Sequence, residues 1–80
     1  SHYAMNKSLV GQPIKKIYSA SDTVVIFESE LGWNGVGGLQ DALKYMDKYK
    51  LDKIGVAFID GSRKTPDREE LKKLKWILEE

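Results

Sequence analysis

The pattern of hydrophobic and polar positions divides the chain into three strand-like and two helix-like stretches. Residues 23–29, TVVIFES, are rich in β-branched and aromatic types and place apolar side chains on both faces of a strand. Residues 53–60, KIGVAFID, repeat this pattern, which is typical of a strand buried on both faces. Residues 13–18, PIKKIY, predict a further short strand, joined to 23–29 as a hairpin.

Two stretches show helical spacing. In residues 39–49 the apolar side chains recur every three or four positions, which predicts an amphipathic helix with one buried stripe. A second helix is predicted to have Thr65 as its N-cap, Pro66 at its first position, acids in its first turn and a stripe of leucines beyond. Trp76 falls on the lysine-rich side of this helix, where it is either exposed or folded back over the core, and exposure is the favoured interpretation.

This order predicts an α+β fold: a single small domain with β-β-α-β-α order, a three-stranded mixed sheet and two helices packed on one face. The strand, helix and strand over 23–60 predict a parallel crossover. Because both of its strands are apolar on both sides, the sheet face without helices has few residues to cover it. This uncovered face is the sequence feature that says most about function.

Composition and charge narrow the chemistry. Residues 1–4, before Met5, look like an expression-tag remnant, so the domain is expected over 5–80. The single histidine lies in that remnant and the chain has no cysteine, so thiol and imidazole chemistry are not expected. The net charge of +1 neither requires nor excludes a polyanionic partner. No apolar stretch is long enough for a membrane span, so a cytoplasmic protein without membrane partner is expected.

The glycine-rich stretch GWNGVGG, residues 32–38, is the most distinctive local motif. In a parallel crossover it lies at the carboxyl ends of the strands, where helix amides attract anions. Its glycine spacing matches neither the dinucleotide fingerprint nor the phosphate-binding P-loop. A turn with positive φ at one of its last three glycines is therefore the favoured interpretation. The candidate binding residues in this stretch are Trp33, Asn34, Gly35, Gly37 and Gly38.

Acidic residues at strand ends suggest a metal site. If 23–29 and 53–60 are parallel, Glu28 or Glu30 and Asp60 emerge at the same edge, where they could hold Mg²⁺. An aspartate followed by glycine, as at Asp60, is more often part of a turn. A magnesium-dependent enzyme is therefore ranked last. We predict no enzymatic activity, no metal site and no cofactor.

The expected function is that of a small protein-interaction module, an accessory or regulatory factor of the kind phages or plasmids carry. It is expected to bind a protein partner and to form a homodimer through the uncovered sheet face or an edge strand. Trp33 and Trp76 are the predicted interface anchors, since exposed tryptophans are typical of interfaces. The alternative is a nucleic-acid or nucleotide binder that uses residues 32–38 with Arg63 and Lys64, although acids interleave with the nearby lysines.

Overall fold

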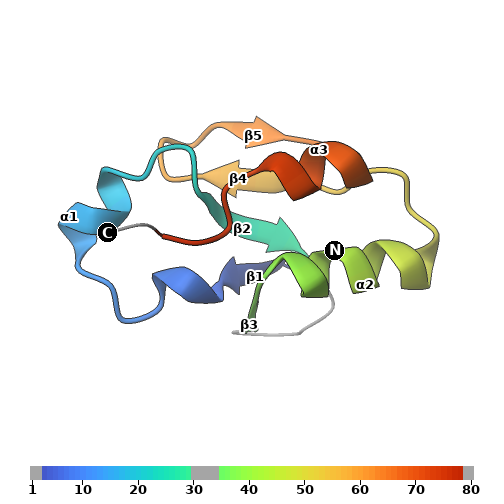
Figure 1. Ribbon diagram of the computed structural model, residues 1–80, viewed down its shortest axis with the longest axis horizontal. Coiled ribbons are helices and arrows are strands. Elements are labelled where there is room, and N and C mark those ends of the chain that lie inside the picture. Colours follow the sequence, from blue (N-terminus) through green and yellow to red (C-terminus); the bar gives the residue numbers. More distant parts are fainter. Residues whose placement is uncertain (1–2, 30–34, 79–80) are drawn as a thin grey trace.

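The computed structural model describes residues 3–29 and 35–78, which form an α+β fold (Figure 1). Its elements, in chain order, are β1 (Tyr3–Asn6), the 3-10 helix η1 (Lys7–Leu9), α1 (Ile14–Tyr18), β2 (Val24–Glu28), β3 (Val36–Gly37), α2 (Leu39–Tyr49), β4 (Val56–Phe58), β5 (Arg63–Lys64) and α3 (Arg68–Lys73). The prediction of helix over 39–49 is confirmed, and the strands predicted over 23–29 and 53–60 contain β2 and β4. None of the helices in the described part is long and apolar enough to cross a membrane.

The sheet is mixed, as predicted, but it has five strands rather than three, in the order β3-β1-β2-β4-β5. β1 pairs with β3 in parallel, while the β1–β2, β2–β4 and β4–β5 pairs are antiparallel. The predicted parallel pairing of β2 with β4 is therefore wrong. β3 and β4 run in the same direction, so the crossover through α2 exists, but it begins at β3 and passes over β1 and β2.

Three elements differ from the sequence prediction. Residues 14–18 form α1 instead of a strand, because Ile14 and Ile17 are spaced for one helical side and Pro13 suits a helix start. β1 includes Tyr3 and the buried Ala4, so the sheet extends into residues that the sequence analysis leaves out of the domain. β3 and β5 have only two residues each, too few to give a periodic signal.

The hydrophobic core lies between the sheet and the helices α2 and α3, which both cover the face seen in front in Figure 1. From the sheet, Val24, Phe27 and Val56 point into it, and α2 contributes Ala42 and Met46. The other buried members are Ala4, Ile54, Phe58, Leu71 and Trp76.

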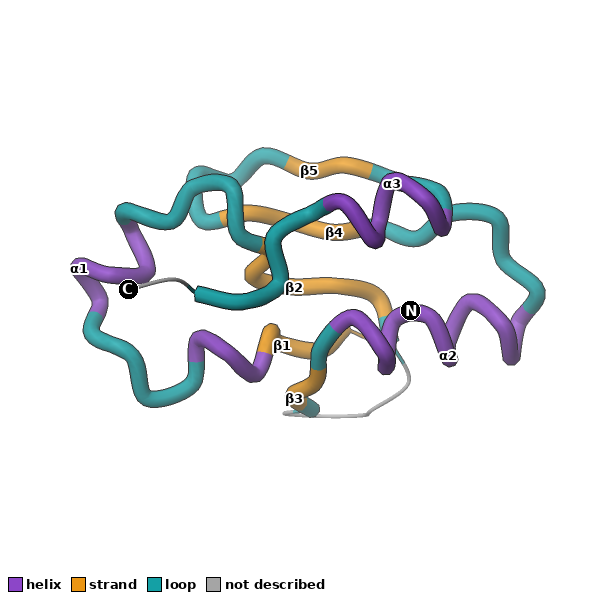
Figure 2. Tube along the Cα trace, in the orientation of Figure 1, coloured by secondary structure: helices purple, strands orange, loops and turns teal. Residues whose placement is uncertain are grey.

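The last helix is shorter than predicted. Its N-cap is Asp67, not Thr65, and the Asp67 carboxylate accepts a hydrogen bond from the Glu70 backbone N–H at 2.9 Å. The helix ends at Lys73, and Figure 2 shows the following segment as a loop that passes beside the start of β2. There the backbone N–H of Val24 donates to the carbonyl of Lys75 at 2.9 Å. We call residues 74–78 the C-terminal segment.

Asn6 joins the C-terminal segment to the sheet. Its side chain is fully buried, and Nδ2 donates to the carbonyls of Val24 at 2.8 Å and Trp76 at 3.0 Å. Its Oδ1 accepts from the backbone N–H of Ser8 at 3.0 Å. One side chain therefore fixes β1, β2 and the C-terminal segment to one another.

Positive φ occurs elsewhere than predicted. The described glycines with positive φ are Gly11 and Gly61, whereas Gly37 lies in β3 and Gly38 has φ −140°. Gly61, at φ 86°, makes the turn between β4 and β5. No atom lies within 4 Å of a Cβ built there, so its requirement for glycine is conformational only.

We expect Gly61→Ala to lower the free energy of unfolding by about 1 kcal/mol, because a left-handed backbone strains any residue with a Cβ. Urea unfolding of the variant measures this. Gly61→Asn is the matched control, since asparagine tolerates this conformation and is expected to lose less. Equal losses in both variants would contradict the explanation by backbone strain.

Candidate functional site: the open face of the sheet

One row of side chains crosses the sheet face opposite the helices. The pairing of the five strands places its members side by side, in the order Val36, Met5, Ile26, Ala57 and Arg63. Val36, Met5 and Ile26 expose 50%, 42% and 40% of their surface. We call these five residues together with Tyr3 the open face. It corresponds to the uncovered face that the sequence predicts.

The alternation of β1 explains why these side chains are exposed. Ala4 and Asn6 point into the core, so Tyr3 and Met5 point to the other side. In β2 the pairing with β4 shifts register between Val24 and Ile26. Both Val24 and Phe27 are buried as a result, and Ile26 remains on the open face.

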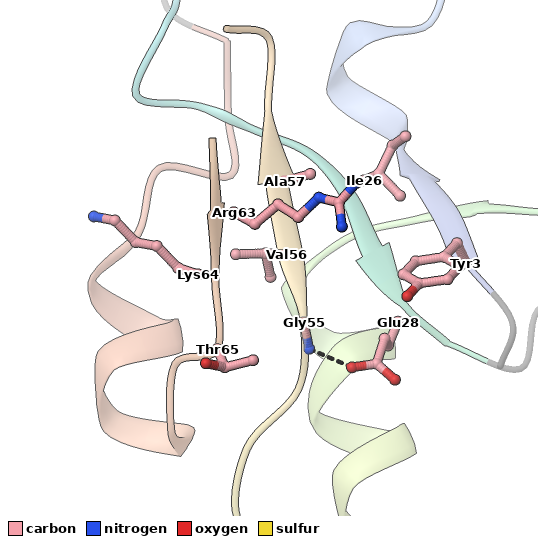
Figure 3. Close-up of a pocket in the computed structure, with 9 residues that line it drawn as sticks. All are labelled: Tyr3, Ile26, Glu28, Gly55, Val56, Ala57, Arg63, Lys64 and Thr65. Atoms are coloured by element: carbon pink, nitrogen blue, oxygen red, sulfur yellow. Dashed lines mark hydrogen bonds between the residues drawn. The ribbon is translucent and has the colours of Figure 1, made fainter. Parts of the chain in front are cut away.

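The open face has a hollow of about 650 Å³ above β4 (Figure 3). Its floor is low because Gly55 and Ala57, along β4, carry little or no side chain. Larger side chains of the neighbouring strands stand on both sides, with Ile26 and Glu28 from β2 and Arg63 from the β5 side. Tyr3 and Thr65 complete the outer parts of the two walls.

Glu28 closes one end of the hollow. One of its carboxylate oxygens accepts a hydrogen bond from the backbone N–H of Gly55. A Cβ at position 55 would lie 3.0 Å from that oxygen, so a glycine lets the carboxylate approach the backbone of the strand. Within the described part of the chain, no hydrogen bond involves the other carboxylate oxygen.

Arg63 and Lys64, predicted as one basic site, point in different directions (Figure 3). Arg63 extends over Ala57 toward Ile26, and it forms no ion pair with any described residue. The Nζ atom of Lys64 lies 5.7 Å from the ring centroid of Phe58. Of these two cations, only Arg63 therefore directs its charged group over the hollow.

The structure does not bring the glycine-rich stretch to these cations. Gly35, Gly37 and Gly38 lie at or next to β3, at the opposite edge of the sheet from β5, about 19 Å away at the usual strand spacing. Trp33 and Asn34 lie outside the described residues.

At the start of α2, the Asp41 carboxylate accepts a hydrogen bond from the Gly38 backbone N–H at 2.9 Å. This carboxylate occupies the position in which a bound anion would be stabilised.

The prediction of Trp76 as an exposed anchor is wrong. The side chain is buried, and its ring packs edge-on against Phe27, with centroids 5.2 Å apart and an interplanar angle of 73°. Its Nε1 donates to the carbonyl of Leu71 at 2.9 Å. The residue leaves the polar side of the predicted helix because the helix ends before it.

The acidic residues do not form the metal site considered above. Because β2 and β4 are antiparallel, Glu28 and Asp60 lie at opposite ends of the sheet. Asp60 instead accepts hydrogen bonds from Ser62, at 2.9 Å from the backbone N–H and 2.6 Å from Oγ. These bonds hold the pKa of Asp60 below its usual value, so their contribution to stability is lost as the pH falls through this lowered pKa. The described residues contain no group of three side chains placed to hold a metal ion, and Glu30 lies outside them.

No protein-family model, curated protein or solved structure matches the chain. The functional conclusion therefore depends on the geometry of the site.

Sequence reasoning missed Tyr3 and Met5, which it placed in or beside a tag, and gave no role to Gly55 and Ala57. The signal for the hollow was the pair of small residues at alternate positions of a strand whose other face carries Val56 and Phe58.

Proposed function

We propose that the protein is a non-enzymatic interaction module that binds a protein partner, and a second copy of itself, through the open face. The observation that supports this most is the exposure of Val36, Met5 and Ile26 side by side on three adjacent strands. Contiguous apolar surface of this kind is typical of protein-binding sites. A domain of this size also buries a modest fraction of its surface, so covering the face stabilises it.

In the proposed homodimer, two sheets pack face to face across a twofold axis. β2 is the central strand, so Ile26 of one copy lies near Ile26 of the other. Met5 and Val36 extend the apolar contact on one side of Ile26. Arg63 lies on the other side, at the edge of the sheet. An apolar centre with a charged rim is the usual anatomy of such an interface.

We expect Ile26→Lys to weaken self-association by about tenfold or more, because it places two ammonium groups at the centre of the interface. Sedimentation equilibrium over a range of protein concentrations measures the effect. Ile14→Lys is the matched control: Ile14 is also exposed, but it lies on α1, away from the open face. Thermal unfolding of each variant checks that the fold is intact.

A wild-type protein that remains monomeric at high micromolar concentration would contradict the self-association proposal. An equal effect of both substitutions would mean that self-association does not use the open face.

The alternative function is nucleotide or nucleic-acid binding by residues 32–38 with Arg63 and Lys64. It has less support because β3 and β5 are opposite edges of the sheet. Oligonucleotide titration at low and high salt tests it, since phosphate contacts make affinity fall steeply with salt.

A further inference from the structure

We propose that the hollow above β4 binds an aromatic side chain with an N–H or O–H donor, tryptophan or tyrosine, presented by a partner protein. The inference rests on the proposed function, because it takes the open face as a protein-binding surface. It adds the chemistry of the partner's anchoring residue. The shape of the hollow and two polar groups on its walls favour such a ring.

The shape favours a flat group. The floor consists of Gly55 and Ala57, and the side chain of Ile26 borders it. A ring that lies on this floor, beneath the Arg63 side chain, contacts all three residues. The volume of about 650 Å³ is within the range of sites that hold ring-sized groups.

The two charged walls select a neutral ring with a donor. The guanidinium of Arg63 extends over the floor, forms no ion pair with the described residues, and can stack on a ring face. The second carboxylate oxygen of Glu28 is an acceptor for an indole N–H or a phenol O–H. A cationic side chain pairs with Glu28 but is repelled by Arg63, an acidic one pairs with Arg63 but is repelled by Glu28, and an aliphatic one leaves both groups without a partner, whereas a neutral ring with a donor satisfies both.

The open shape of the hollow indicates a protein as the source of the ring. Tyr3, Arg63 and Thr65 are exposed, so a ring bound between the floor and the Arg63 guanidinium still has part of its surface open to solvent. Sites for small molecules bury most of the ligand surface, which this hollow does not do. A partner that presents the ring on its own surface covers the remaining side.

The ring is expected to come from a different protein. Among the described aromatic residues away from the open face, Tyr18 and Tyr49 are the exposed ones, and they lie on α1 and α2. A second copy that inserts either one must present α1 or α2 to the open face, which is a different contact from the face-to-face dimer. The dimer and the ring site are therefore separate uses of the open face.

Titration with N-acetyl-tryptophanamide, followed by ¹H–¹⁵N correlation spectra, tests the site. We expect the amide signals of Gly55, Ala57 and Arg63 to shift progressively, with N-acetyl-leucinamide causing smaller shifts. Ala57→Leu fills the floor and is expected to weaken binding by about tenfold or more, whereas Ala20→Leu, the same change in the loop before β2, is expected to have no effect. Glu28→Gln keeps the shape, but its amide can turn an N–H₂ toward the ring, so we expect binding about fivefold weaker.

The outcomes separate this inference from the proposed function. Shifts at the hollow in a protein that remains monomeric would support the ring site while self-association fails. Absence of shifts at a protein concentration at which the chain is monomeric, or equal shifts with the tryptophan and leucine amides, would overturn the ring site even if Ile26→Lys disrupts a dimer. If Ala57→Leu unfolds the protein, the comparison of Glu28→Gln with the wild type decides.

Discussion

Replacing Trp76 by alanine is expected to lower the free energy of unfolding by about 3–5 kcal/mol, the usual cost of removing a large buried aromatic side chain. The ring fills the core between Phe27 and Leu71, and its Nε1 donates to the Leu71 carbonyl. Urea unfolding followed by far-ultraviolet circular dichroism measures the loss. The change is a large part of the total stability of a small domain.

Two further substitutions make this prediction specific. Trp76→Phe retains a ring but loses the hydrogen bond and part of the packing, so we expect an intermediate loss of about 1–2 kcal/mol. Ile77→Ala changes the exposed neighbour in the C-terminal segment and is expected to stay within about 0.5 kcal/mol of the wild type. A small effect of Trp76→Ala would mean that the C-terminal segment does not pack on the core as described.

Asn6→Ala is expected to cost about 2–4 kcal/mol, because it leaves the carbonyls of Val24 and Trp76 without their donor in a buried position. Thermal and urea unfolding measure the loss. Asn6→Asp keeps the shape but places an acceptor against both carbonyls, so it is expected to be at least as destabilising at neutral pH. Lys7→Ala, at the exposed next position, is the control and is expected to change little.

A loss confined to Asn6→Ala, with Asn6→Asp close to the wild type, would contradict the role of Nδ2 as the donor that matters. It would indicate that side-chain volume at this position is what the core requires. The two substitutions therefore separate hydrogen bonding from packing at one site.

The elements that the sequence predicts well are those whose pattern is long and local. The helix over 39–49 has three turns of consistent spacing, and 23–29 is too rich in β-branched residues for anything but a strand. Residues 14–18 are spaced as a helix only through Ile14 and Ile17, and one such interval is too short a pattern to predict a helix.

The C-terminal segment could not be predicted from local pattern. Leu71, Leu74 and Leu78 fit one helical stripe, yet the helix stops because distant residues compete for the backbone. Val24 bonds the carbonyl of Lys75, and Asn6 bonds that of Trp76. These partners come from strands whose positions depend on the whole fold.

The candidate site was predictable in part. Two-sided apolar strands predicted an uncovered face, but the hollow depends on the side chain of Arg63 standing beside β4. That placement follows from a two-residue strand formed by a turn at Gly61. The antiparallel β2–β4 pair was missed for a related reason: β1 lies between β2 and β3, and its first two residues were excluded from the fold.

The hydrogen bond between Asn6 and the C-terminal segment also limits when the sheet can complete its packing during synthesis. β1 is made before the C-terminal segment, and the carbonyl that its Asn6 side chain bonds belongs to a residue 70 positions later. While the chain is still being extended, the buried polar groups of β1 have no complete set of partners, so the sheet cannot reach its final packing. The sheet therefore completes its packing only after the C-terminal segment has left the ribosome, and contacts of such long sequence separation slow folding.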